Sequence, residues 1–131
     1  MLVRECIKPD SPIPIYEQIV AQVIFDVASG SLPAGEMIPS VRDLALRLDV
    51  HPNTVARAFS ELDKRGVITA RRGRGMEVTA EAPARCRAER QQIVRERIRE
   101  ALLEAISSSL PANEIRKLVD EELAKANGRG H

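Results

Sequence analysis

The sequence has few of the residues that build metal sites, disulfide frameworks and aromatic cores. Trp is absent and aromatic residues make up 2% of the 131 residues, so the core has to be built from Leu, Ile, Val and Ala. The two cysteines, Cys6 and Cys86, form no CxxC pair and have no neighbouring His, which argues against a zinc site or a disulfide scaffold. We expect reduced thiols, no metal ion and no cofactor.

Histidines and long apolar runs are also scarce. His51 is the only histidine before the C-terminal residue, so the sequence offers no obvious nucleophile–base pair for catalysis. No glycine-rich phosphate loop follows a predicted strand. No stretch approaches the ~20 apolar residues of a membrane span, and the first residues lack the apolar run of a signal peptide. The sequence predicts a cytoplasmic protein that is not an enzyme and has no membrane partner.

Basic residues are concentrated in one part of a chain whose net charge is only +1. Residues 40–75 carry eight Lys or Arg residues and four Asp or Glu residues. A basic surface of this kind can neutralise nucleic-acid phosphates, although charge alone is equally compatible with a solvated face.

Hydrophobic spacing predicts three helices in the first half of the chain. Prolines 9, 12 and 14 discourage helix in residues 1–12, which we expect to form an arm. Apolar residues then recur at three- and four-residue steps from about Ile13 to the Ser29-Gly30 pair. A second helix is expected to start at Ser40, and after a tight turn a third is expected to start at Pro52.

The third predicted helix is followed by a hairpin and two more helices. Two short β-branched or alternating stretches, 67–70 and 76–79, flank an Arg-Gly-rich turn. A linker over 81–84 and helices over about 85–108 and 112–126 complete the chain. The expected fold is mainly α with a small β-hairpin: a winged helix-turn-helix over 13–80 and a short C-terminal helical dimerisation region over 81–131.

The third predicted helix has two chemically different faces. Val55, Phe59 and Leu62 lie at steps of four and three and are expected to face the core. The opposite face carries Asn53, Thr54 and Arg57 in the first turns, where a recognition helix meets base edges. Arg can pair with guanine and Asn with adenine, but taken alone Asn53 and Thr54 more often mark a helix start, and Arg57 is more often a solvated surface residue.

Several spaced motifs resemble the GntR family of transcription regulators. The resemblance covers about residues 11–79, and the short two-helix C-terminal part resembles the YtrA subfamily. The matching residues are Pro14-Ile15-Tyr16-Glu17-Gln18-Ile19, Gly30-x-Leu32-Pro33-Ala34-Gly35-Glu36, Ile38-Pro39-Ser40-Val41-Arg42-Asp43-Leu44-Ala45, Val50-x-Pro52-Asn53-Thr54-Val55-x-Arg57-Ala58, Glu61-Leu62, Gly66-Val67-Ile68 and Arg71-Arg72-Gly73-Arg74-Gly75.

This resemblance implies a DNA-binding dimer, usually a repressor and often one that controls a transporter operon. Two positions depart from the family pattern: Asp49 stands where relatives usually have Gly, and His51 where they often have other polar residues. Asp tolerates left-handed φ, so the turn should form. The DNA contacts that the resemblance implies are Arg42, His51, Asn53, Thr54, Arg57, Arg72 and Gly73.

The C-terminal helices are the expected dimer interface. Their apolar stripes would be partly exposed in a single chain, and a second copy would cover them. A homodimer would fit a pseudo-palindromic double-stranded DNA operator. Any small-molecule effector would sit in an apolar cleft between helices or at the dimer interface. The stripe residues are Val94, Ile98, Leu102, Ile106, Leu118, Val119 and Leu123.

A winged helix that binds protein rather than DNA is the alternative interpretation, because fold does not determine function. A protein-docking face would carry apolar anchors where this sequence has Arg57 and the arginines of the hairpin turn, Arg71, Arg72 and Arg74.

Overall fold

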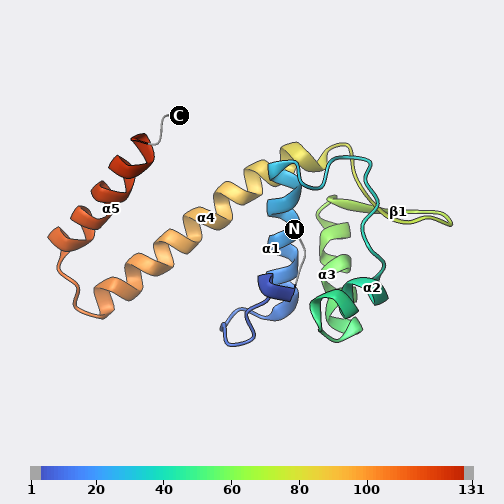
Figure 1. Cartoon of the computed structure of the whole chain (residues 1–131), viewed down its shortest axis with the longest axis horizontal. Helices are drawn as coiled ribbons and strands as arrows, with labels where there is room; N and C mark the ends of the chain where they lie inside the picture. The colour runs from blue at the N-terminus through green and yellow to red at the C-terminus, as the bar shows by residue number, and fades with distance from the viewer. Residues whose placement is uncertain (1–3, 129–131) are drawn as a thin grey trace. The chain divides into compact units, whose positions relative to one another are not determined.

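The computed structural model describes residues 4–128, and its chain is mostly helical with one hairpin (Figure 1). Residues 1–3 of the expected arm and 129–131 of the C-terminal region lie outside the described residues. The fold class is as predicted. The elements are η1 (Arg4–Cys6), α1 (Ile15–Ser29), α2 (Val41–Leu48), α3 (Pro52–Lys64), β1 (Ile68–Arg71), β2 (Gly75–Val78), α4 (Ala82–Ser107) and α5 (Ala112–Asn127).

Local caps set the ends of the first three helices. Gly30 adopts φ +89° after α1, and the Ser40 hydroxyl accepts a hydrogen bond from the Asp43 N–H at 3.1 Å at the start of α2. Asp49 adopts φ +56° in the turn between α2 and α3, so the residue that replaces Gly there does support the turn. The predicted helix starts and stops are confirmed to within about two residues.

The hydrophobic core of the N-terminal unit forms where α1 and α2 pack against α3. The core is aliphatic apart from Phe59 and Cys86, in agreement with the composition. Val55, Phe59 and Leu62 of α3 are buried, which confirms the predicted inward face. The largest fully buried side chains are Ile19, Ile24, Leu44, Leu48, Leu62, Ile68, Val23, Val27, Val55, Val67, Val78 and Cys86.

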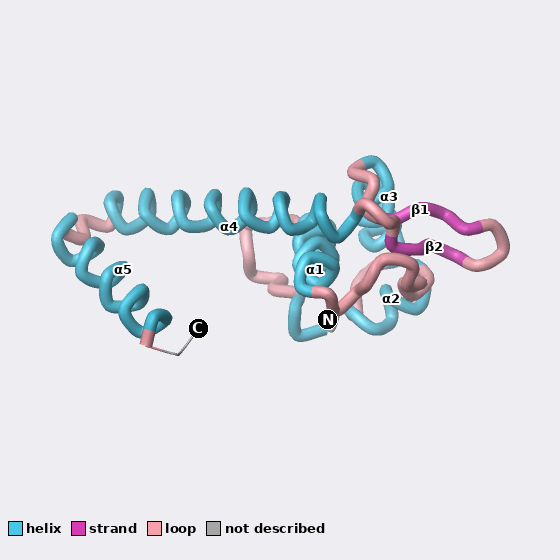
Figure 2. The backbone as a smooth tube through the Cα atoms, turned by 90° about the horizontal axis from the view of Figure 1, so that it is seen from above, coloured by secondary structure: helices cyan, strands magenta, loops and turns pink. Residues whose placement is uncertain are grey.

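Strands β1 and β2 form the predicted antiparallel hairpin, with Ile68 opposite Val78 and Arg71 opposite Gly75 (Figure 2). A further segment pairs with β2: the Ile38 N–H donates to the Met76 carbonyl at 3.0 Å, and the Val78 N–H to the Glu36 carbonyl at 2.9 Å. The hairpin is therefore anchored to the segment that precedes α2, a pairing that the sequence analysis did not foresee.

Helix α4 begins earlier than predicted, and the expected linker over 81–84 is wrong. Ala82 and Cys86 are fully buried and belong to the core. Just before the helix, the polar groups of the Glu81 backbone and the Thr79 side chain stabilise the charged carboxylate of Glu81 and lower its pKa. The N-terminal unit consequently reaches Ile93, and the second unit starts at Val94.

Burial also governs the chemistry of Cys86. Desolvation by burial makes the larger contribution and the negative charge of Glu89 the smaller one, and together they raise the pKa of the Cys86 thiol to about 11. The thiol is therefore protonated and unreactive at neutral pH. Cys86 is buried in the core, and Cys6 is partly buried and packs against it.

Arg65 joins the end of α3 to the first part of α4. Its guanidinium contacts Glu61 at 3.1 Å and Glu89 at 2.8 Å, and its carbonyl accepts a hydrogen bond from Arg85 at 3.0 Å. Gly66 follows at φ +75°, and a Cβ there would lie 2.7 Å from the Arg85 guanidinium. These contacts hold the end of α3 against the start of α4.

The described part of the expected arm is folded back on the N-terminal unit. Ile7 packs against the core. The Lys8 N–H donates to the Gln18 side chain at 2.7 Å, and the Gln18 amide donates to the Lys8 carbonyl at 3.0 Å. These contacts explain why the segment does not extend away from the domain.

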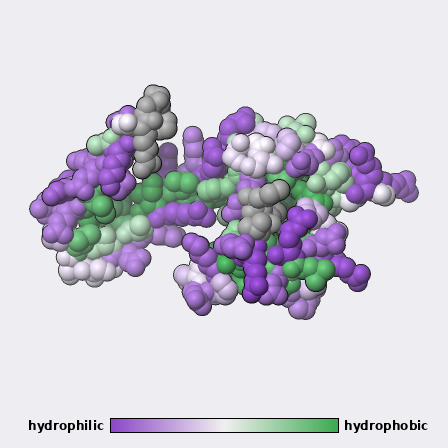
Figure 3. Space-filling view, viewed as in Figure 1, coloured by the Kyte–Doolittle hydropathy of each residue, from purple (hydrophilic) through white to green (hydrophobic). Residues whose placement is uncertain are grey.

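From Val94 onward, no described residue is buried. Ser109 at φ +64° and Pro111 separate α4 from α5, as the sequence predicted. Apolar surface follows the C-terminal helices in Figure 3. None of the helices in residues 4–128 is long and apolar enough to cross a membrane.

Candidate nucleic-acid interface

The outward face of α3 carries the three predicted recognition residues. Asn53 and Arg57 are exposed and Thr54 is half-buried, whereas Val55 between them is fully buried. Pro52 occupies the first turn, so these side chains lie at the N-terminal end of the helix. This geometry presents polar donors outward from a helix whose other face is fixed in the core.

Arg57 is held by an aromatic ring from another helix. Its Cζ lies 3.9 Å from the centroid of the Tyr16 ring, at the start of α1. Arg57 makes no ion pair with the acidic residues in the described part of the chain. The guanidinium therefore keeps its full charge and its edge donors while one face rests on the ring.

His51 caps α3. Its Nδ1 accepts a hydrogen bond from the Asn53 N–H at 3.0 Å. A neutral imidazole that accepts at Nδ1 carries its proton on Nε2, which leaves Nε2–H as a donor from this exposed side chain. The sequence analysis placed His51 among the DNA contacts and did not foresee its capping role.

We expect His51→Ala to lower the free energy of unfolding by about 1 kcal/mol, because it removes the acceptor for the Asn53 N–H. His51→Asn should retain most of the stability, since Asn is a good N-cap residue. Urea unfolding followed by circular dichroism measures both. Equal stability of the alanine and parent proteins would contradict the capping role.

The remaining predicted contacts lie on α2 and in the hairpin. Arg42 is exposed in the first turn of α2, and no acidic side chain within residues 4–128 pairs with it. Arg72 and Gly73 are exposed in the loop joining β1 and β2, where Gly73 adopts φ +72° and a Cβ would have open space around it. Arg71 instead pairs with Glu77, which distinguishes it from its neighbour.

Four further residues belong to this surface that the sequence analysis did not select. Ser60 and Lys64 are exposed and continue the outward face of α3 at helical steps from Arg57, a signal that the spacing contained. Arg74 is exposed beside Arg72. Tyr16 lies within the apolar spacing of α1, and spacing alone does not reveal a ring at the edge of the core.

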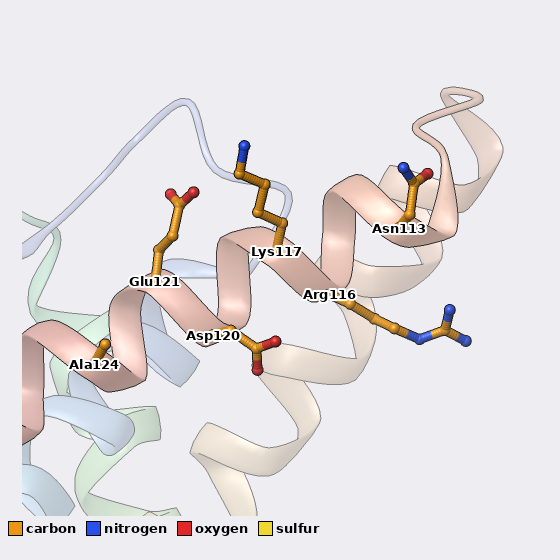
Figure 4. Close-up of a pocket in the computed structure, with 6 residues that line it drawn as sticks. All are labelled: Asn113, Arg116, Lys117, Asp120, Glu121 and Ala124. Carbon is orange, nitrogen blue, oxygen red and sulfur yellow. The ribbon is translucent and has the colours of Figure 1, made fainter.

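The C-terminal unit contains a shallow hollow along α5 (Figure 4). One helix supplies its whole lining, so it differs from the apolar cleft between helices expected for an effector. Across the described residues, no group of three or more His, Cys, Asp and Glu side chains is placed to hold a metal ion. The lining residues are Asn113, Arg116, Lys117, Asp120, Glu121 and Ala124.

Comparison with known proteins places this geometry in a family. Residues 15–78 match the model of the gntR family of bacterial regulatory proteins. The HTH-type transcriptional repressor YtrA of Bacillus subtilis is 30% identical over 122 residues, which cover 93% of this chain and 94% of the relative. The family and this relative are transcription regulators and not enzymes.

Solved structures agree with this assignment. A transcriptional regulator from Oenococcus oeni superposes with a TM-score of 0.65 at 30% identity, covering 91% of this chain and 98% of the other. YtrA from Sulfolobus acidocaldarius, a GntR-family transcription factor, gives 0.56 at 34% identity, covering 74% of this chain and 95% of the other. The chain therefore belongs to the GntR family of DNA-binding transcription regulators, and within it to the YtrA subfamily.

Proposed function

We propose that this regulator is a cytoplasmic homodimeric repressor that binds a pseudo-palindromic operator through its winged helix-turn-helix. The N-terminal end of α3 enters the major groove, and the β1–β2 loop lies along the neighbouring backbone or minor groove. The proposed DNA contacts are Arg42, His51, Asn53, Thr54, Arg57, Arg72 and Gly73. The proposed domain roles are those expected from the sequence, with the start of α4 included in the DNA-binding unit.

The observation that carries this proposal is the outward position of Asn53 and Arg57 beside a buried Val55. The Arg57 guanidinium can donate to guanine and the Asn53 amide can donate to and accept from adenine, while α3 is held in place by its packed face. Arg42, Arg72 and Arg74 are exposed around it and supply charge for phosphates.

Dimerisation through the C-terminal helices is supported by their exposed apolar side chains. The segment from Val94 to Gly128 has no buried residue and gains little stability by itself, and a second copy would remove this surface from water. The exposed fractions are 38% for Val94, 56% for Ile98, 37% for Leu102, 64% for Ile106, 56% for Leu118, 46% for Val119 and 59% for Leu123.

Repression follows from an operator that overlaps a promoter, and the name of the Bacillus subtilis relative supports this sign of regulation. Control of a transporter operon is part of the same proposal. A small-molecule effector bound at the dimer interface would change the spacing of the two α3 helices and thereby the affinity for DNA.

Selection from a random DNA duplex pool tests the proposal. We expect an inverted repeat whose half-sites lie about one helical turn apart, and anisotropy titrations on that duplex give the affinity. Arg57→Ala should weaken specific binding about 5- to 150-fold, because a bidentate guanine contact contributes about 1–3 kcal/mol. Arg116→Ala removes the same charge from α5 and serves as the control. The proposal fails if no inverted repeat is selected, or if Arg42→Ala and Arg57→Ala both bind like the parent.

A further inference from the structure

The aromatic ring of Tyr16 contacts a proposed recognition residue, Arg57. Tyr16 lies at the second position of α1, and α1 packs against α3 along the core of the N-terminal unit. The Tyr16 ring is half-buried, and its hydroxyl contacts the Glu17 carboxylate at 3.2 Å. The ring is therefore part of the folded framework, whereas the guanidinium above it belongs to an exposed side chain.

The contact fixes Arg57 without neutralising it. An acidic partner would also orient a guanidinium, but DNA would then have to displace that partner and would meet no net positive charge. A ring under the face of the guanidinium leaves the five N–H donors around its edge available. Since bidentate pairing with guanine uses that edge, stacking and base recognition are compatible.

We propose that Tyr16 is a positioning residue for DNA recognition, which holds Arg57 in the orientation that pairs with a guanine. This inference rests on the proposed function, because it takes Arg57 as a DNA contact. Tyr16 itself need not touch DNA. Its effect arises because a preordered arginine loses less rotamer freedom when it binds.

Arg57 and Tyr16 variants of the full chain test the inference on the selected duplex and on a scrambled duplex of the same length. Tyr16→Phe keeps the ring and should bind close to the parent, and Tyr16→Trp at least as tightly, because Trp is the strongest cation–π partner. Tyr16→Leu should weaken specific binding about 3- to 30-fold, in line with a partly desolvated cation–π contact. Affinity for the scrambled duplex and the salt dependence of binding should stay unchanged.

The double variant separates positioning from a merely structural role. In an Arg57→Ala background, Tyr16→Leu should cause no further loss of specific affinity, because nothing remains to be positioned. Thermal melting checks folding, and Tyr16→Met offers a second non-aromatic side chain if the leucine variant is unstable.

On the selected duplex, two results overturn the inference while the proposed function stands: Tyr16→Leu binds like the parent although Arg57→Ala is weak, or its loss persists undiminished in the double variant. Parent-like binding by Arg57→Ala itself would overturn both the inference and the assignment of Arg57 to the DNA contacts. A drop on the specific and scrambled duplexes alike would assign Tyr16 a structural role and also overturn the inference.

Discussion

Replacing Ile98 and Leu102 together with Glu is expected to produce a monomer that binds a two-half-site operator about 100-fold or more weakly than the parent. Both side chains are exposed on α4, and two charges on this stripe would oppose burial against a second copy. Without the partner, the second half-site contact is no longer held at high effective concentration, and this avidity is worth about 10²- to 10⁴-fold.

Sedimentation equilibrium measures the first effect and anisotropy on full and half operators measures the second. Affinity for a single half-site should be unchanged, because the N-terminal unit is untouched. Ser107→Glu with Ser108→Glu adds the same charge at exposed positions outside the stripe and should leave the dimer intact. A double Ile98 and Leu102 variant that still sediments as a dimer would exclude this stripe as the interface.

The second large effect is expected at Cys86, where Cys86→Asp should lower the free energy of unfolding by several kcal/mol. This position is 0% exposed within the core of the N-terminal unit. A carboxylate there would be buried, and the penalty for burying a charge without a partner is several kcal/mol. Urea unfolding monitored by circular dichroism gives the value.

Ala88→Asp is the matched control, since Ala88 is exposed on the same helix two residues later. A surface substitution of this kind should change stability by no more than about 0.5 kcal/mol. Equal stability of the two aspartate variants would show that the first part of α4 is not packed against the N-terminal unit in solution.

The parts of the fold that sequence analysis predicted are those set by neighbouring residues. Helix ends are marked by local signals: Ser40 before α2, Pro52 at the start of α3 and Gly30 after α1. Each signal acts on residues no more than three positions away, so the helix ends could be inferred from the chain alone. The inward face of α3 follows from helical spacing in the same way.

The errors occurred where distant segments decide the outcome. The Glu81-Ala82-Pro83-Ala84 stretch has the composition of a linker, but Ala82 is fully buried because it packs into the core of the N-terminal unit. His51 is a local exception: its cap is formed with Asn53, but His is an uncommon N-cap residue, so this role was not apparent from residue type. The pairing of 36–38 with β2 joins residues about forty positions apart, and no local pattern specifies it.

The sequence by itself determined the order of elements, the outward face of α3 and the apolar stripes of the last two helices, because these depend on spacing along one chain. Only the tertiary structure decided that α4 starts inside the N-terminal unit and that Tyr16 of α1 contacts Arg57 of α3. The physical reason is that burial and stacking depend on which faces meet across the core. Helical periodicity indicates the direction of a side chain but does not identify the residue that it contacts.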